Sequence, residues 1–173
     1  PVAVDARAIP NVKRIVVFAD FNTIPIAVDF TPEKAAAYIA FNMKLDQSTA
    51  IRAAVQLEDG RWLVNSAKGK AAGGGCSTPP RSRVNDSWAK HLGEMRGNLK
   101  VAASQDGKAA NKRMALTIRH PMDTGLVENN PIYYIDKIAL QADGNGGESV
   151  ALGRLLTYAS LSEDPGFYFV MPA

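Results

Sequence analysis

The residue best suited to chemistry is Cys76, the only cysteine in the chain, which follows three consecutive glycines, Gly73, Gly74 and Gly75. A thiolate is a nucleophile, and glycine leaves the backbone free to move. A flexible arm from Lys68 to Cys76 has a root-mean-square span of about 15 Å, enough to place the sulfur in the cleft of another protein. The pattern predicts an exposed thiol on a swinging arm, with the two lysines of the arm favouring the thiolate modestly.

Two interpretations of Cys76 remain open from the residues alone. In the first, a flexible arm delivers the thiol to another protein. In the second, the glycine-rich stretch only links two domains and the cysteine is incidental. No histidine or aspartate stands at a fixed spacing that would activate the thiol, so the sequence supports a carrier better than a catalyst. A lone cysteine excludes an intramolecular disulfide but allows one between two copies of the chain.

A second conspicuous stretch is His120-Pro121-Met122-Asp123-Thr124-Gly125. His120 and Met122 could join Cys76 in binding a soft metal such as copper, or His120 and Cys76 could bind zinc, and the only other histidine is His91. These ligands lack the local spacing of a metal site. We favour a structural role, in which His120 hydrogen-bonds the turn while Asp123 and Thr124 satisfy backbone donors, and we predict neither a metal nor a cofactor.

Composition narrows the function classes. The chain has 173 residues, 46% of them hydrophobic, and a net charge of +3, which is typical of a folded domain and makes nucleic-acid binding a poor guess. The longest apolar run, residues 35–41, is far shorter than the roughly 20 residues of a membrane-spanning helix. Three successive glycines without a following Lys-Ser/Thr pair do not make a phosphate-binding loop.

Alternation of apolar and polar residues predicts β-strands on both sides of the arm. In residues 50–58 the apolar side chains from Ile51 to Leu57 share one face, and Asp59-Gly60 then marks a hairpin. Residues 15–21, with Phe21 on the core face, and residues 26–30 flank a turn at residues 22–25. Strands return at residues 112–120, and residues 143–147 separate another pair, 132–141 and 148–158.

These patterns predict an all-β fold of two β-sandwich domains, residues 1–75 and 98–173. Residues 76–97 would form the rest of the arm, a linker and a short amphipathic helix. Trp88, Leu92 and Met95 are spaced for one helix face, between the N-cap candidates at 85–86 and Gly97.

The order of these motifs resembles the SoxYZ sulfur carriers, in the single-chain form associated with quinoprotein dehydrogenases. The resemblance rests on the segment with Asn22 and Pro25, the Gly-Gly-Gly-Cys run, the His-Pro-Met-Asp-Thr-Gly string and residues 162–165, Ser-Glu-Asp-Pro. Residues 1 to about 78 resemble SoxY and residues 98–173 resemble SoxZ.

The resemblance implies two immunoglobulin-like sandwiches, a periplasmic location and no catalysis by the chain itself. It implies that sulfur intermediates are attached to Cys76 on a tether formed by Gly73, Gly74 and Gly75. The partners would be sulfur-oxidation enzymes, or a quinoprotein dehydrogenase and its cytochrome. In contrast to SoxY, the chain continues beyond the cysteine with Ser77-Thr78-Pro79-Pro80, so the arm is tethered at both ends. The family's opening helix and first strand have no counterpart after Pro1, so the first domain is expected to be N-terminally incomplete.

Overall fold

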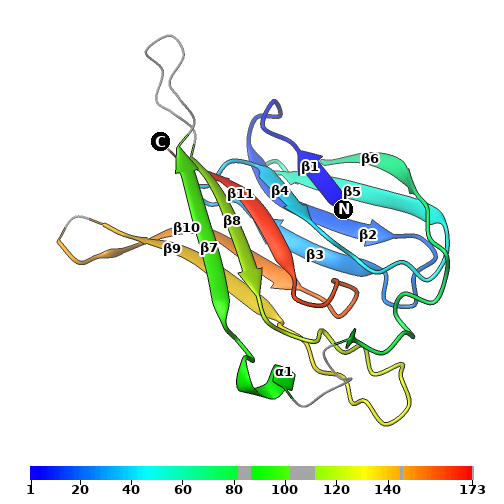
Figure 1. The fold of residues 1–173 in the computed structure, drawn as a ribbon. Helices are drawn as coiled ribbons and strands as arrows, with labels where there is room; N and C mark the ends of the chain where they lie inside the picture. The colour runs from blue at the N-terminus through cyan, green and yellow to red at the C-terminus, as the bar shows by residue number, and fades with distance from the viewer. Residues whose placement is uncertain (82–86, 102–111, 145, 173) are drawn as a thin grey trace.

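The computed structural model describes the chain except for residues 82–86, 102–111, 145 and 173. The described residues form eleven strands and one short helix (Figure 1). Their bounds are β1 Val2–Asp5, β2 Val12–Ala19, β3 Ile26–Thr31, β4 Tyr38–Phe41, β5 Thr49–Leu57, β6 Trp62–Gly69, α1 Ser87–Lys90, β7 Met95–Val101, β8 Lys112–Ile118, β9 Lys137–Asp143, β10 Ser149–Thr157 and β11 Gly166–Met171.

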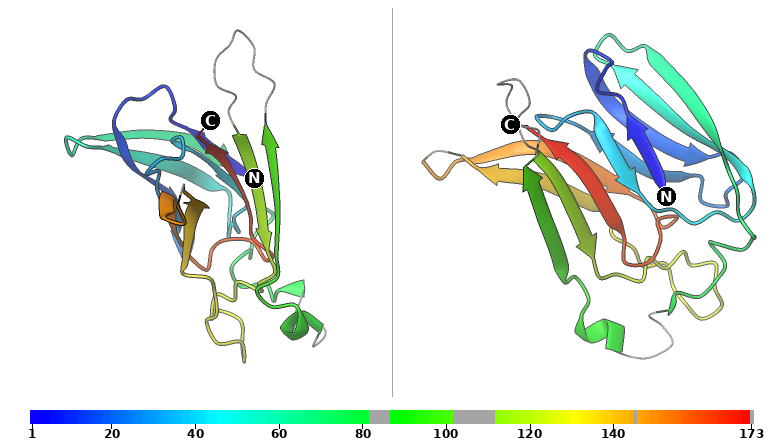
Figure 2. Two further views of the ribbon diagram at one scale, coloured as in Figure 1. Left: turned by 90° about the vertical axis from the view of Figure 1, so that its left-hand side faces the viewer. Right: turned by 45° about the horizontal axis from the view of Figure 1, so that its top comes forward.

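The strands form two antiparallel sheets, which lie as two layers in Figure 2. One has the order β1-β4-β11-β8-β7 and the other the order β6-β5-β2-β3-β10-β9. The predicted all-β, sandwich-like fold is therefore confirmed. The hairpins predicted at Asp59-Gly60 and at residues 143–147 are also found, as β5–β6 and β9–β10.

Strands from the two predicted halves pair within both sheets. β4 pairs with β11 in one sheet, and β3 pairs with β10 in the other. The rings of Phe30 on β3 and Phe169 on β11 lie 5.6 Å apart between the sheets. One hydrophobic cluster contains buried residues from both halves, including Ile15 and Leu155. The division of the chain into two domains stays a prediction, but the two parts share a core.

The helix prediction was too long. α1 covers only Ser87–Lys90, Leu92 lies beyond it, and Met95 begins β7. The N-cap candidates at 85–86 lie outside the described residues. Backbone pairing explains the difference, because residues 95–101 gain a full ladder of partners on β8, whereas a short amphipathic helix gains little on its own.

Phe21 also departs from its predicted place on the core face. β2 ends at Ala19, and Phe21 lies in the turn before β3 with 66% of its surface exposed.

No helix among the described residues is long and apolar enough to cross a bilayer.

Candidate functional site

Cys76 lies in a packed polar environment rather than on an exposed arm. Only 1% of its surface is accessible, so the predicted exposure of the thiol is wrong for this conformation. The cysteine is held by two loops from the first half of the chain, around Asn22 and around Asp46, and by the loop after β8 that contains Thr124.

The glycine run is docked by backbone hydrogen bonds. The N–H of Gly74 donates to the carbonyl oxygen of Asp46 at 2.9 Å, and the N–H of Gly75 donates to that of Leu45 at 3.2 Å. Gly73 and Gly74 have φ values of +112° and +68°, which favour glycine over other residues. A Cβ on Gly75 would lie 2.6 Å from the Leu45 carbonyl oxygen. In this structure these glycines form a tight turn and permit close backbone contact, and their role as a tether stays a prediction.

Asp46 connects the arm to the β2–β3 turn. Its Oδ1 accepts a hydrogen bond from the N–H of Cys76 at 2.8 Å, and its Oδ2 accepts one from the N–H of Thr23 at 2.9 Å. The amide of Asn22 supports this arrangement by accepting from the N–H of Asp46 at 2.9 Å and donating to the carbonyl oxygen of Lys44 at 2.8 Å. The nitrogen of the same amide lies 3.9 Å from the sulfur of Cys76.

The second half of the chain completes the enclosure. The hydroxyl of Thr124 donates to the carbonyl oxygen of Cys76 at 2.5 Å and accepts from the N–H of Leu126 at 3.2 Å. The ammonium of Lys44 donates to the carbonyl oxygens of Met122 at 2.5 Å and Ala159 at 3.3 Å. The loop after β8 therefore contacts both Cys76 and Lys44, and the segment after β10 holds Lys44 as well.

The thiol is protonated in this position at neutral pH. Burial raises the pKa of Cys76 to about 11, and the negative charge of Asp46 acts in the same direction. The ammonium of Lys44 opposes them, and burial in turn lowers the pKa of Lys44. The cation that acts on the thiol is thus Lys44, not the two lysines of the arm. Because the thiolate is the reactive form, the docked cysteine is a weak nucleophile.

His120 has the structural role that the sequence favoured. Its Nδ1 accepts a hydrogen bond from the N–H of Met122 at 3.0 Å, and the Thr124 hydroxyl satisfies a backbone donor in the same turn. Asp123 exchanges backbone hydrogen bonds with Tyr133 across this loop, and the predicted role of its carboxylate as an acceptor for backbone donors stays a prediction. Among the described residues, no cluster of three histidine, cysteine or carboxylate side chains could hold a metal ion.

Sequence reasoning missed Lys44 and Asp46, which lie between β4 and β5 in a stretch without periodicity or a motif. Asn22 and Thr124 stood within the quoted motifs, but nothing in their spacing placed them beside Cys76. They are 54 and 48 residues away from it in sequence.

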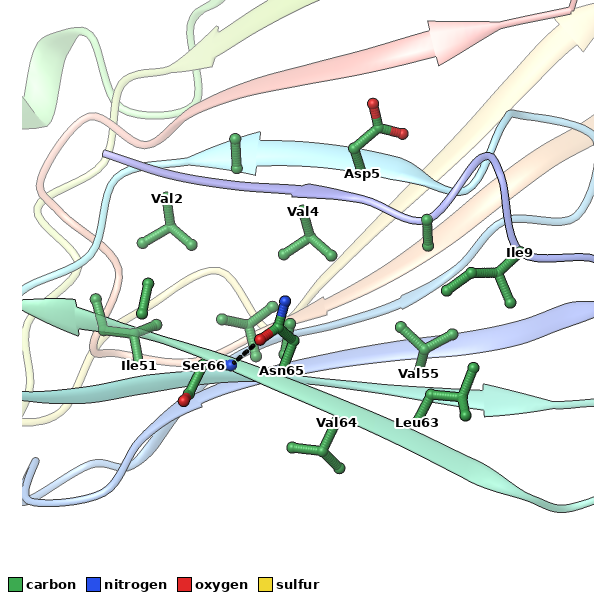
Figure 3. Close-up of a pocket in the computed structure, with 15 residues that line it drawn as sticks. Val2, Val4, Asp5, Ile9, Ile51, Val55, Leu63, Val64, Asn65 and Ser66 are labelled. Carbon is green, nitrogen blue, oxygen red and sulfur yellow. Dashed lines mark hydrogen bonds between the residues drawn. The ribbon is translucent and has the colours of Figure 1, made fainter.

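A separate apolar groove lies between β1 and β6, which are edge strands of the two sheets (Figure 3). Its volume is about 290 Å³. Val2 and Val4 on one side face Val55 and Leu63 on the other, and Asp5 points away from the groove. Cys76 is not among the residues that line it.

Comparison with protein-family models finds a match to the segment that ends at Cys76. Residues 1–76 match the family described as Sulfur oxidation protein SoxY. Neither the curated proteins nor the solved structures contain a match to the chain. The SoxZ-like assignment of residues 98–173 stays a prediction. Residues 1–76 are thus similar to SoxY, in agreement with the resemblance predicted for this part of the chain from its sequence motifs.

Proposed function

We propose that this chain is a periplasmic carrier that holds sulfur-containing intermediates on Cys76 and presents them to partner redox enzymes. The observation that carries the proposal is the position of Cys76 as the last residue of the SoxY-matching segment, enclosed by loops from both halves of the chain. The single cysteine is the attachment point, and the partner enzymes supply the redox chemistry.

The attachment step is an oxidative coupling. With thiosulfate as cargo, the Cys76 thiol loses its proton and its sulfur forms a bond to the outer sulfur of thiosulfate. The product is a cysteine S-thiosulfonate, and two electrons pass to an oxidising partner protein. Later hydrolysis of the S–SO₃ bond by a partner would release sulfate and leave a persulfide on the cysteine.

The docked structure requires the carrier to open before it reacts. The buried, protonated thiol offers no path for a partner's active site, so the arm must leave Asp46 and Thr124 first. Residues 74–76 of the arm make three hydrogen bonds to the Leu45–Asp46 backbone and the Asp46 carboxylate, and Thr124 supplies a fourth. The docked state therefore protects the thiol between encounters, and the undocked state delivers it.

Intact-mass measurement tests this proposal. The purified chain is incubated with thiosulfate and an oxidant such as ferricyanide, with and without mild denaturant to undock the arm. We expect one S₂O₃ group on the native chain, added faster when the arm is loosened, and none on Cys76→Ala. No adduct on the native chain, or equal labelling of Cys76→Ala, would rule the carrier out.

The burial of Cys76 also favours a second candidate, in which the thiol is a packing residue and the chain is an accessory module that docks on a quinoprotein dehydrogenase or its cytochrome. In that case the interaction with the partner would survive Cys76→Ala. Co-purification of both forms from the native host, together with intact-mass measurement of the cargo, separates the two functions, because an accessory module keeps its partner without Cys76 and carries no sulfur adduct on the native cysteine.

A further inference from the structure

The β7 strand is a sheet edge, and its side chains are exposed on both faces. Among the described residues β7 pairs only with β8, and it forms the margin of its sheet in both views of Figure 2. All seven of its residues are exposed. Such an edge presents unpaired backbone donors and acceptors, to which another strand can add.

The inner face of this sheet loses its cover progressively toward β7. On β11, Phe167 and Phe169 are buried, and on β8 the neighbouring Met114 is half-buried. On β7 the same face carries Met95, Leu99 and Val101, which are 69%, 56% and 63% exposed. Met95, Leu99 and Val101, with Gly97 between the first two, form an apolar surface on this edge that contact with a further apolar strand would bury.

The outer face of the same strand is cationic. Arg96 and Lys100 alternate with the apolar residues, and Lys100 is paired in register with Arg113 on β8. Glu94, just before the strand, is hydrogen-bonded to His91 at 2.6 Å. Edge lysines often serve only to prevent aggregation. On β7, however, the apolar face of the same strand is exposed and can still contact a partner strand. The cationic side chains would then attract an acidic strand and repel a basic one.

We propose that β7 docks an extended segment of a partner protein in which apolar and acidic residues alternate. The segment adds as a sixth strand to the sheet. Its apolar residues cover Met95, Leu99 and Val101, and its carboxylates lie beside Arg96 and Lys100. This surface is distinct from the Cys76 site and does not depend on the carrier function.

A second copy of the chain is a poor occupant of this edge. Antiparallel pairing of two β7 strands about Asn98 would place Arg96 of each copy opposite Lys100 of the other. Four cationic side chains would then gather on one face of two adjacent strands, where like charges repel. The charge pattern thus points to a different, acidic protein.

The test uses synthetic seven-residue peptides, matched to the length of β7, with the full chain. One alternates valine with glutamate, the second alternates valine with lysine, and the third is the glutamate peptide with alternate backbone nitrogens methylated. Binding is measured by calorimetry at low and high salt, and hydrogen exchange locates the protected amides. We expect only the first peptide to bind, to weaken as salt rises, and to protect β7.

Charge reversal supplies the matched variants. Arg96→Glu/Lys100→Glu should weaken the glutamate peptide by about tenfold and admit the lysine peptide. Lys13→Glu/Lys137→Glu makes the same change in net charge on β2 and β9, and should leave binding unchanged. Equal affinity for both peptides, undiminished binding of the methylated peptide, protection of another edge strand, or no binding at millimolar concentration would overturn the proposal.

Discussion

Substituting Thr124 by valine should loosen the arm and make Cys76 reactive. The two side chains have nearly the same shape, but valine cannot donate to the Cys76 carbonyl oxygen, which Thr124 reaches at 2.5 Å. Loss of one neutral hydrogen bond costs about 1 kcal/mol, and a buried acceptor left unsatisfied raises the cost to about 2 kcal/mol. The undocked population should therefore rise by roughly fivefold to thirtyfold.

Alkylation of the thiol by iodoacetamide under native conditions measures this population. The rate equals the undocked fraction multiplied by the rate for a free cysteine, which a short Gly-Gly-Cys peptide provides. We expect Thr124→Val to react about five to thirty times faster than the native chain. Circular dichroism must show that the variant remains folded at the temperature of the assay.

Two control variants separate the hydrogen bond from other effects. Thr124→Ser retains the hydroxyl and should react at the native rate. Thr117→Val makes the same substitution at an exposed position on β8 and should also leave the rate unchanged. If Thr124→Val reacts no faster than the native chain, or if the serine variant accelerates as much, the hydroxyl does not hold the arm and the reasoning fails.

Three other predictions follow from the same structure. Because burial raises the pKa of Cys76 from about 9 to about 11, the docked state is stable below pH 9 and weakens as pH rises toward 11. The alkylation rate of the native chain should thus climb up to about pH 11, whereas the rate of the urea-unfolded chain should level off near pH 9. If the rate of the native chain also levels off near pH 9, the thiol is not docked. Gly75→Ala places a Cβ 2.6 Å from the Leu45 carbonyl oxygen and should speed alkylation, while Gly97→Ala on exposed β7 should not; equal rates would show that the arm is not docked on Leu45. Phe169→Ala should lower the free energy of unfolding by about 3–5 kcal/mol, and urea unfolding should remain one transition by both fluorescence and circular dichroism, since Phe169 packs in the core shared by both halves; two separate transitions would indicate independent domains.

Local patterning was sufficient to predict the strands but not their arrangement. The alternation in residues 50–58 and the Asp59-Gly60 turn depend on neighbouring residues, and both appear in β5 and β6. The pairings β4–β11 and β3–β10 join segments more than a hundred residues apart, and nothing in either segment specifies its partner. A division by sequence order therefore could not reveal that the two parts share one core.

The helix expected around Trp88 shows a different limit. The spacing of Trp88, Leu92 and Met95 fits a helix, but Met95, Leu99 and Val101 also alternate with the polar residues of a strand. A short apolar pattern can satisfy both periods. Backbone pairing with β8 favours the strand over the helix. The residue pattern of one segment carries no information about such a partner.

The glycine run illustrates why composition alone could not distinguish a free arm from a docked one. Glycine is needed wherever a chain must move freely, and equally wherever it must turn with positive φ or pass close to another backbone. Gly73 and Gly74 meet the second need through their φ values, and Gly75 meets it through its contact with Leu45. The same residues still permit a mobile arm once the contacts of Asp46 and Thr124 are broken. A few hydrogen bonds of about 1 kcal/mol each hold the docked state, so partner binding of moderate strength could release it. In the proposed carrier the run would therefore serve two states, and the strength of the hydrogen bonds that dock it, rather than the presence of glycine, would determine how often the thiol is exposed.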